Sequence, residues 1–288
     1  MNLSILIPVF NEAETIKSVI SGLQNELLNL NLTNYEILVI NDCSTDATAE
    51  ILKTIENIKI ITQPYNKGYG AALKTGAKQA VYDWLMFYDA DGQHKPEYLK
   101  DFLPYTQNFD LVSGERIGYK GPWIRQPGKR FINWLVKYLF KIKINDVNCG
   151  FRLVKKHEFL RFSHLFPDGF SISTTTVFAF LKEKLNIKFV PLTINKRAGG
   201  KSMVKPRQAF VYLMLIFRLV MLFSPLRIFL PVSGFLFGVG LIYLIYDLTM
   251  VNISEGTIFI LITSILIFLF GLIADQIAAL RREISLKN

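Results

Sequence analysis

The chain has 288 residues, of which 51% are hydrophobic, and its formal net charge is +10 at pH 7. This length allows one large domain or two small ones, and two cysteines are too few for a disulfide framework. A basic chain can bind nucleic acid or an anionic membrane surface, but no helix-turn-helix, zinc-finger or RNP pattern occurs here. The composition therefore favours a membrane as the partner and gives no indication of nucleic acid.

The first 90 residues alternate apolar runs typical of strands with segments of helical spacing. We predict strands at 3–9, 35–42, 58–62 and 84–88, and helices at 12–28, 44–55 and 68–81. Asn11 is expected to cap the first helix, because its side chain can accept a hydrogen bond from the first turn. This order predicts an α/β fold with a mostly parallel sheet covered by helices. In such sheets, ligands bind beyond the carboxyl ends of the strands.

Two carboxylates, Asp89 and Asp91, follow the fourth predicted strand in the segment "MFYDADGQHKP". Like charges this close repel each other unless a cation or water lies between them. Carboxylate oxygens suit Mg²⁺ or Mn²⁺, and Gln93 offers a third oxygen. Because Mg²⁺ usually takes one or two protein carboxylates plus substrate phosphates, the pattern indicates a bound nucleoside diphosphate. An ordinary solvated turn also has the pattern D-x-D-G, so the motif alone leaves both interpretations open.

Three other nucleotide or metal motifs do not fit. In an EF-hand loop the glycine would come later than Gly92 does. The segment "GYGAAL" opens the third predicted helix and lacks the G-x-G-x-x-G spacing of a dinucleotide-binding turn. No Walker A sequence occurs.

The segment from residue 117 to residue 145 contains no acidic residue. Its basic and aromatic residues are Lys120, Arg125, Lys129, Arg130, Lys137, Lys141, Lys143, Tyr119, Trp123, Phe131, Trp134, Tyr138 and Phe140. A basic amphipathic helix with aromatic residues, here at about 121–143, is typical of a membrane interface. An ordinary packed helix with a solvated face would look similar, and the apolar segments that follow favour the membrane. A second interfacial helix is expected at 206–224, where Arg218 lies within an apolar run.

Two segments near the end of the chain, at about 228–247 and 257–274, are almost without charge. At about 1.5 Å rise per residue, each can cross a hydrocarbon core of roughly 30 Å. Two buried core helices are the alternative, which the short polar link between the segments disfavours. We therefore expect a catalytic domain at 1–205 and a two-helix transmembrane domain at 225–288.

The distribution of basic residues predicts the orientation in the membrane. Lys and Arg are frequent before the first span and in the tail "RREISLKN", whereas the link between the spans has none. The positive-inside rule then places both termini and the catalytic domain in the cytoplasm. A strand-like run follows Met1 without a basic segment, so no secretory signal peptide is expected.

Four segments occur in a characteristic order: "IPVFNEAETI", "VINDCSTDAT", "NKGYGAALKTG" and "DADGQHKPE". Together they resemble the family 2 glycosyltransferases, which have the GT-A fold. Three later segments, "VNCGFRLVKK", "VPLTINKRAGGKSMVKP" and "FSPLRIFLPVSG", resemble the polyprenyl-phosphate hexosyltransferases. This group includes the dolichyl-phosphate mannose synthases and the bacterial polyprenyl-phosphate glucosyltransferases. The resemblance covers almost the whole chain.

The resemblance implies that a nucleotide-sugar binds together with a divalent metal, Mg²⁺ or Mn²⁺. The nucleotide pocket would be lined by Pro8, Asn11, Glu12 and Asp42. The metal and diphosphate motif would comprise Asp89, Ala90, Asp91 and Gln93, with Asp89, Asp91 and Gln93 as metal ligands. Without the resemblance, Asn11 and Asp42 would be interpreted as plain capping residues.

The resemblance also implies a late element that closes on the pyrophosphate, formed by Arg197, Lys201 and Ser202. Arg116 and Arg130 lie near the positions of the family's ligands for the lipid phosphate. The residues expected to act directly in catalysis are Asp91, Arg116 and Arg197.

The resemblance implies transfer of one hexose from a donor of the GDP-mannose or UDP-glucose type to polyprenyl phosphate. It also gives a precedent for a homo-oligomer. A processive polysaccharide synthase is a first alternative, but the Q-x-x-R-W motif of such enzymes is absent. A non-catalytic membrane scaffold with a transferase-like domain is a second, and it would predict a broken metal motif. The intact pair of aspartates favours the enzyme.

Overall fold

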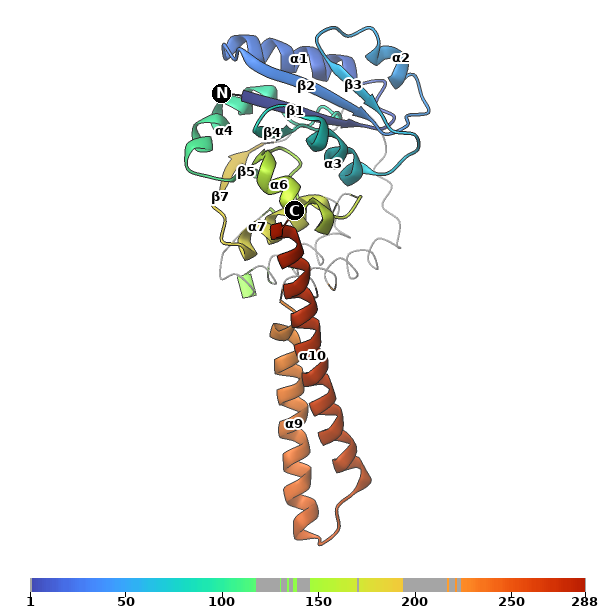
Figure 1. Cartoon of the computed structure of the whole chain (residues 1–288), viewed down its shortest axis with the longest axis vertical. Helices are drawn as coiled ribbons and strands as arrows, with labels where there is room; N and C mark the ends of the chain where they lie inside the picture. The colour runs from blue at the N-terminus through green and yellow to red at the C-terminus, as the bar shows by residue number, and fades with distance from the viewer. Residues whose placement is uncertain are drawn as a thin grey trace. The chain divides into compact units, whose positions relative to one another are not determined.

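The computed structural model describes residues 2–117, 130, 134, 137–138, 146–169, 171–193, 217, 221 and 224–287 (Figure 1). The chain divides into two compact units, Met1–Ala209 and Phe210–Asn288. The first unit contains an α/β domain and the second contains a pair of long helices.

A single mixed sheet forms the centre of the first unit. Its strands are β1 (Asn2–Val9), β2 (Asn34–Asn41), β3 (Lys59–Thr62), β4 (Trp84–Phe87), β5 (Leu111–Arg116), β6 (Arg152–Lys155) and β7 (Ile187–Leu192). The order across the sheet is β3-β2-β1-β4-β6-β5-β7. Only β6 runs antiparallel to its neighbours β4 and β5 among the strands described. The predicted mostly parallel α/β sheet is therefore confirmed.

Helices cover both faces of this sheet, because the central strands are apolar on both sides. The helical segments are α1 (Ile16–Asn29), α2 (Thr48–Leu52), α3 (Tyr69–Gln79), η1 (Pro96–Tyr98), α4 (Leu99–Phe102), η2 (Leu103–Gln107), α6 (Lys156–Phe162), η4 (Ser163–Leu165) and α7 (Ile172–Lys182). On one face, α1 and α4 pack in one core with alternate residues of β1, β2 and β4. On the other face, Gly76 of α3 lies against Ile40, and a Cβ there would be 2.7 Å from the Ile40 Cδ1. The absence of a side chain thus lets α3 approach the sheet closely.

The predicted capping role of Asn11 is wrong. The cap position of α1 is Thr15, and Asn11 lies four residues earlier with φ of 56°. Its side-chain oxygen accepts a hydrogen bond from the Thr45 amide at 2.8 Å instead. A local signal for a cap was therefore outcompeted by a contact between two loops. The second predicted helix is also shorter than expected, since α2 begins only at Thr48.

The second unit is a hairpin of α9 (Leu226–Thr249) and α10 (Glu255–Lys287). Leu226–Thr249 and the Glu255–Arg281 part of α10 are long and apolar enough to cross a membrane, with mean hydropathies of 2.3 and 2.8. Only 11% and 17% of their most apolar windows are buried, which is unlike the core helices of a soluble domain. Gly240 and Gly271 let the two helices approach, since a Cβ at either would contact Leu261 or Phe229 below 3.0 Å.

A polar cluster closes the link between the two helices. The Asp247 carboxylate accepts hydrogen bonds from the Thr257 hydroxyl at 2.6 Å and from the Ser254 amide at 2.8 Å. The Ser254 hydroxyl oxygen accepts the amide of Thr257 at 3.3 Å, which satisfies a donor in the first turn of α10. The polar link predicted between the spans is thus an ordered turn.

Candidate active site

The loops that carry the predicted site residues meet at one edge of the sheet. Leu6 of β1 pairs with Phe87 of β4, and Val9 of β1 pairs with Asn41 of β2, so these strands end side by side. The antiparallel strand β6 begins at the same edge, because its Arg152 pairs with Phe87. The residues that follow β1, β2 and β4 and those that precede β6 can therefore face one ligand.

The β1–α1 and β2–α2 loops are tied together at this edge. The amide of Glu12 donates a hydrogen bond to the Thr48 hydroxyl at 3.0 Å, next to the Asn11–Thr45 contact. The predicted nucleotide residue Pro8 lies within β1 and pairs with Ile40. This network holds together the two loops that are predicted to line the nucleotide.

Asp42 is buried at the end of β2. Its two carboxylate oxygens accept hydrogen bonds from the amides of Lys67 and Gly68, each at 2.8 Å. The carboxylate therefore holds the loop before α3. Any contact with a base or ribose would be made in addition to this structural role.

The carboxylate loop after β4 is shaped by a tight turn. Gly92 has φ of +71°, a conformation that side chains disfavour, and the Gln93 amide donates to Asp91 Oδ1 at 3.1 Å. The Thr15 hydroxyl donates to the Ala90 carbonyl at 2.8 Å and so links this loop to the start of α1. Sequence-distant segments thus fix the spacing of the two carboxylates.

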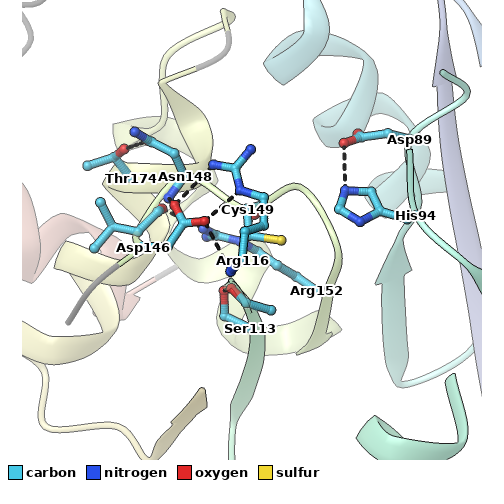
Figure 2. A network of polar contacts seen from close by, with 11 residues as sticks. Asp89, His94, Ser113, Arg116, Asp146, Asn148, Cys149, Arg152 and Thr174 are labelled. Carbon is cyan, nitrogen blue, oxygen red and sulfur yellow. Dashed lines mark hydrogen bonds and ion pairs between the residues drawn. The ribbon is translucent and has the colours of Figure 1, made fainter. Parts of the chain in front are cut away.

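Asp89 is held by one residue of α3 and by one residue of its own loop. Its Oδ1 accepts a hydrogen bond from the Tyr69 hydroxyl at 2.7 Å, and its Oδ2 lies 3.5 Å from His94 Nε2 (Figure 2). Burial by itself raises the pKa of the Asp89 carboxyl, but the hydrogen bond and attraction of His94, followed by Tyr69 and Arg116, outweigh it. The pKa therefore lies below its ordinary value and Asp89 is ionised at neutral pH. Burial and the charge of Asp89 raise the pKa of Tyr69, so its hydroxyl remains a donor.

The donor set fits a hard divalent cation. Among the described residues, no three His, Cys, Asp or Glu side chains gather as a complete metal cage. Two carboxylates on one short loop, with the amide oxygen of Gln93 nearby in sequence, match the sparse protein ligation of Mg²⁺ or Mn²⁺ beside a diphosphate. The residues that would hold the cation are the predicted Asp89, Asp91 and Gln93.

Arg116, the predicted ligand of the acceptor phosphate, forms a two-pronged pair with Asp146 in the loop before β6. Its Nε and Nη2 donate to the two carboxylate oxygens at 2.5 and 3.0 Å. Asp146 also accepts the Asn148 amide at 3.1 Å, and Thr174 donates to the Asn148 side chain (Figure 2). Two donors of the Arg116 guanidinium are thus used to fix its plane.

The loop that carries Asp146 is anchored by a buried arginine. Arg152 is fully buried, and its guanidinium donates to the carbonyls of Cys149, Val147 and Ser173. Burial lowers the pKa of Arg152 from its ordinary value and raises the pKa of the neighbouring Cys149 thiol to about 12. These contacts fix residues 146–150 between the sheet and α7.

Several predicted site residues lie outside the described residues, namely Arg197, Lys201 and Ser202. The segments predicted as interfacial helices are described only in part. Arg130, Trp134, Lys137 and Tyr138 are helical and exposed, and the rings of Trp134 and Tyr138 stack at 5.5 Å.

Tyr69, His94, Asp146 and Gly150 lie at the site but were not among the residues predicted for it. Tyr69 and His94 belong to the motifs "NKGYGAALKTG" and "DADGQHKPE", so their membership of those motifs was the available signal. A Cβ on Gly150 would lie 2.2 Å from Asp89 Oδ2. That approach depends on the pairing of β4 with β6, which no local pattern encodes.

The fold and the site define an α/β domain of the GT-A type, followed by a hairpin of two apolar helices that are candidate membrane spans. Residues 4–166 match the family model described as Glycosyl transferase family 2, and residues 224–280 match the model described as GtrB C-terminal hairpin. The chain belongs to glycosyl transferase family 2, which confirms the resemblance predicted from the motifs.

Named relatives agree with this family. A dolichol-phosphate mannosyltransferase of Pyrococcus furiosus is 32% identical over 76% of this chain and 64% of its own length. Glycosyltransferase AglJ of Haloferax volcanii is 28% identical over 97% of this chain and 94% of its own. An undecaprenyl-phosphate 4-deoxy-4-formamido-L-arabinose transferase of Aeromonas hydrophila is 28% identical over 54% and 49%. The chain thus spans less than two thirds of the first and third relatives.

Solved structures support the fold. Glucosyl-3-phosphoglycerate synthase of Mycobacterium tuberculosis, in complex with phosphoglyceric acid, has a TM-score of 0.59 at 19% identity and covers 76% of this chain and 79% of its own. The same enzyme with Mn²⁺, UDP-glucose and phosphoglyceric acid also scores 0.59, at 18% identity over 76% and 78%. At such identity, the likeness establishes the GT-A-like fold.

Proposed function

We propose that this protein is a membrane-bound inverting glycosyltransferase that moves one hexose from a nucleotide-sugar to polyprenyl phosphate. The donor is of the GDP-mannose or UDP-glucose type, and the reaction takes place at the cytoplasmic face of the membrane. The observation that carries the proposal is the combination of the Asp89 and Asp91 carboxylates, of which Asp89 is ionised, at the ligand edge of a GT-A-like sheet with two apolar helices in the same chain. The names of the Pyrococcus and Aeromonas relatives, which specify dolichol phosphate and undecaprenyl phosphate, support the class of acceptor.

The donor side of the reaction needs a place for a negatively charged diphosphate. Asp89 and Asp91 would hold a divalent cation there, and that cation would stabilise the leaving nucleoside diphosphate as a Lewis acid. The loops at Asn11 and Asp42 would line the nucleotide, and their mutual hydrogen bonds keep them in place before it binds. The predicted Arg197, Lys201 and Ser202 would close on the pyrophosphate.

The acceptor phosphate needs little chemical activation. Its oxygen is already anionic at neutral pH, so no proton has to be removed before it attacks the anomeric carbon. The new carbon–oxygen bond forms opposite the old one, which breaks and leaves its electron pair on the nucleoside diphosphate. The task of the protein is therefore to position two anions and to balance their charge. Arg116, whose plane is fixed by Asp146, and the exposed Arg130 would contribute positive charge on the acceptor side.

The membrane supplies the lipid acceptor. Trp134 and Tyr138 are 55% and 43% exposed and lie one helical turn apart, with the exposed Lys137 between them. Exposed aromatic and basic residues on a helix are typical of the membrane interface. Such a surface would place the catalytic unit against the headgroups, where a polyprenyl phosphate presents its anionic end.

A transfer assay with the full chain tests the proposal. Purified protein in proteoliposomes with polyprenyl phosphate is incubated with radiolabelled UDP- and GDP-sugars, with Mn²⁺ or Mg²⁺, and then with EDTA. We expect one donor to label an organic-extractable lipid, and chelation to abolish the labelling. A labelled polymer would favour the processive synthase, and a donor that binds without transfer would favour the scaffold. Sealed vesicles of opposite orientation, given a donor that cannot cross the membrane, test the predicted face.

A further inference from the structure

We propose that Tyr69 and His94 are positioning residues that hold the Asp89 carboxylate in the orientation required by a divalent cation and its diphosphate. This inference rests on the proposed function and deepens its donor site. Neither side chain is expected to touch the sugar or the reacting atoms. Both would act through Asp89.

Tyr69 reaches Asp89 from a fixed point on another element. It is the first residue of α3, and its hydroxyl lies 2.7 Å from Asp89 Oδ1. The next two amides of the helix, on Gly70 and Ala71, donate to the Asp168 carbonyl at 2.6 and 3.1 Å. A Cβ on Gly70 would be 2.3 Å from the Pro167 carbonyl oxygen, so the backbone here lies in close contact with that loop. The start of α3 is thus fixed, so the backbone that carries the Tyr69 phenol is held in place.

His94 reaches the other oxygen of Asp89 from inside the carboxylate loop. Its side chain is only 4% exposed, and its Nε2 lies 3.5 Å from Asp89 Oδ2. The imidazole packs against the Phe151 ring at 5.3 Å, and the His94 carbonyl accepts the Tyr88 hydroxyl at 2.9 Å. Both the ring and the backbone of this residue are therefore held in place.

The surroundings of the His94 ring decide which of its two nitrogens donates a hydrogen bond. In the described part of the chain, the buried Nδ1 has no hydrogen-bond partner. A buried N–H without an acceptor costs more than a bare lone pair, so the proton belongs on Nε2, which faces Asp89. The 3.5 Å separation is at the upper limit for a hydrogen bond. Such contacts commonly shorten when the ligands of a site are bound.

Gly150 lies against the third side of the carboxylate. Because it has no Cβ, the backbone of the 146–150 loop can pass close to Asp89. Asp89 is thus enclosed by α3, by its own loop and by the loop before β6. Mutation of an outer group that orients a metal ligand typically lowers metal affinity or activity by about 10- to 100-fold. Tyr69 and His94 have the placement of such groups.

The test measures metal binding as well as transfer, using the full chain in detergent. Tyr69→Phe removes a single oxygen, His94→Gln retains an N–H near the position of Nε2, and His94→Asn moves the amide away from it. Tyr105→Phe and His157→Gln are matched controls on other surfaces, since His157 is 74% exposed and Tyr105 lies on η2. Titration calorimetry with Mn²⁺ and either UDP or GDP gives the Kd, and thermal unfolding checks the fold.

We expect Tyr69→Phe and His94→Asn to weaken Mn²⁺-dependent nucleotide binding by about 10- to 100-fold. His94→Gln and both controls should remain within about threefold of the parent, and the KM for polyprenyl phosphate should not change. Nucleotide binding in EDTA should be equal in parent and variants, because a merely structural defect would weaken it too.

Unchanged Mn²⁺-dependent binding in Tyr69→Phe and His94→Asn would overturn the inference while leaving the proposed function intact. A loss that is equally large in EDTA would also overturn it. Absence of Mn²⁺–nucleotide binding and of transfer in the parent itself would instead refute the proposed function. If one variant does not fold, the other residue still decides the outcome, since each contacts a different oxygen of Asp89.

Discussion

Substitution of Gly150 by alanine tests whether the position of Asp89 matters for transfer. An added Cβ would lie 2.2 Å from Asp89 Oδ2, 2.8 Å from its Cγ and 2.9 Å from its Oδ1. The distances from this Cβ to all three carboxylate atoms are below 3.0 Å, which is closer than real Cβ contacts. Rotation about the last side-chain bond cannot relieve the overlap, so the whole carboxylate has to move.

The size of that movement gives the expected effect. The nearest oxygen must shift by at least about 0.8 Å, which stretches its contacts with Tyr69 and His94. Misplacement of a reacting group by about 1 Å can cost on the order of a hundredfold in rate. We therefore expect Gly150→Ala to lower kcat/KM for the nucleotide-sugar by about a hundredfold. The Asp89 side chain is 25% exposed and can turn toward solvent, so the loss of thermal stability should be small.

The assay is labelled-lipid formation at several donor concentrations, together with thermal unfolding of both proteins. Gly169→Ala is the matched control, because nothing lies within 4 Å of a Cβ at that position. It should retain parental activity and stability. If Gly150→Ala keeps kcat/KM within about twofold of the parent while it remains folded, the assignment of Asp89 to the donor site is wrong.

Asp91→Ala should abolish transfer while the protein remains folded. The control Asp101→Ala, at an exposed position, should leave transfer unchanged. Full turnover by Asp91→Ala would contradict the metal site. Alkylation at pH 8 should label Cys43 in the folded protein but not Cys149, because burial raises the pKa of Cys149 to about 12 and keeps its thiol protonated and covered. Mass spectrometry measures the labelling, and equal labelling of both thiols would contradict the buried position. Burial raises the pKa of Asp46, but hydrogen bonds from the start of α2 and from the β1–α1 turn outweigh it and leave it below 3.8. Its stabilising effect is therefore present above this value and is lost as the pH falls through the lower pKa of the folded state, so the thermal stability of Asp46→Asn should depend less on pH below about 4 than that of the parent.

The sequence indicated the parallel half of the sheet and the position of the carboxylates. Strands β1 to β4 and the helices between them follow from apolar runs and helical spacing, which depend on neighbouring residues. The rule that ligands bind at the carboxyl ends of parallel strands then placed Asp42, Asp89 and Asp91 at one edge. The two apolar helices could also be predicted from the sequence, because their length and hydropathy are local properties.

Other features were decided only by the tertiary structure. Asn11 has the residue type of a helix cap, but its contact with Thr45 places it in a loop with positive φ. The approach of Gly150 to Asp89 and the pairing of Arg116 with Asp146 require the antiparallel strand β6 between β4 and β5.

The physical reason lies in the range of the interactions. Hydrophobic periodicity and capping preferences act over a few residues, so they can be read from a single segment. The order of strands in a sheet depends on which faces of distant segments pack together, and a single sequence contains no local record of that choice. The sequence therefore determined the kind of domain, the carboxylate pair and the two long apolar helices, whereas the surroundings that orient Asp89 and Arg116 were determined by the packing of β6 and the loop before it.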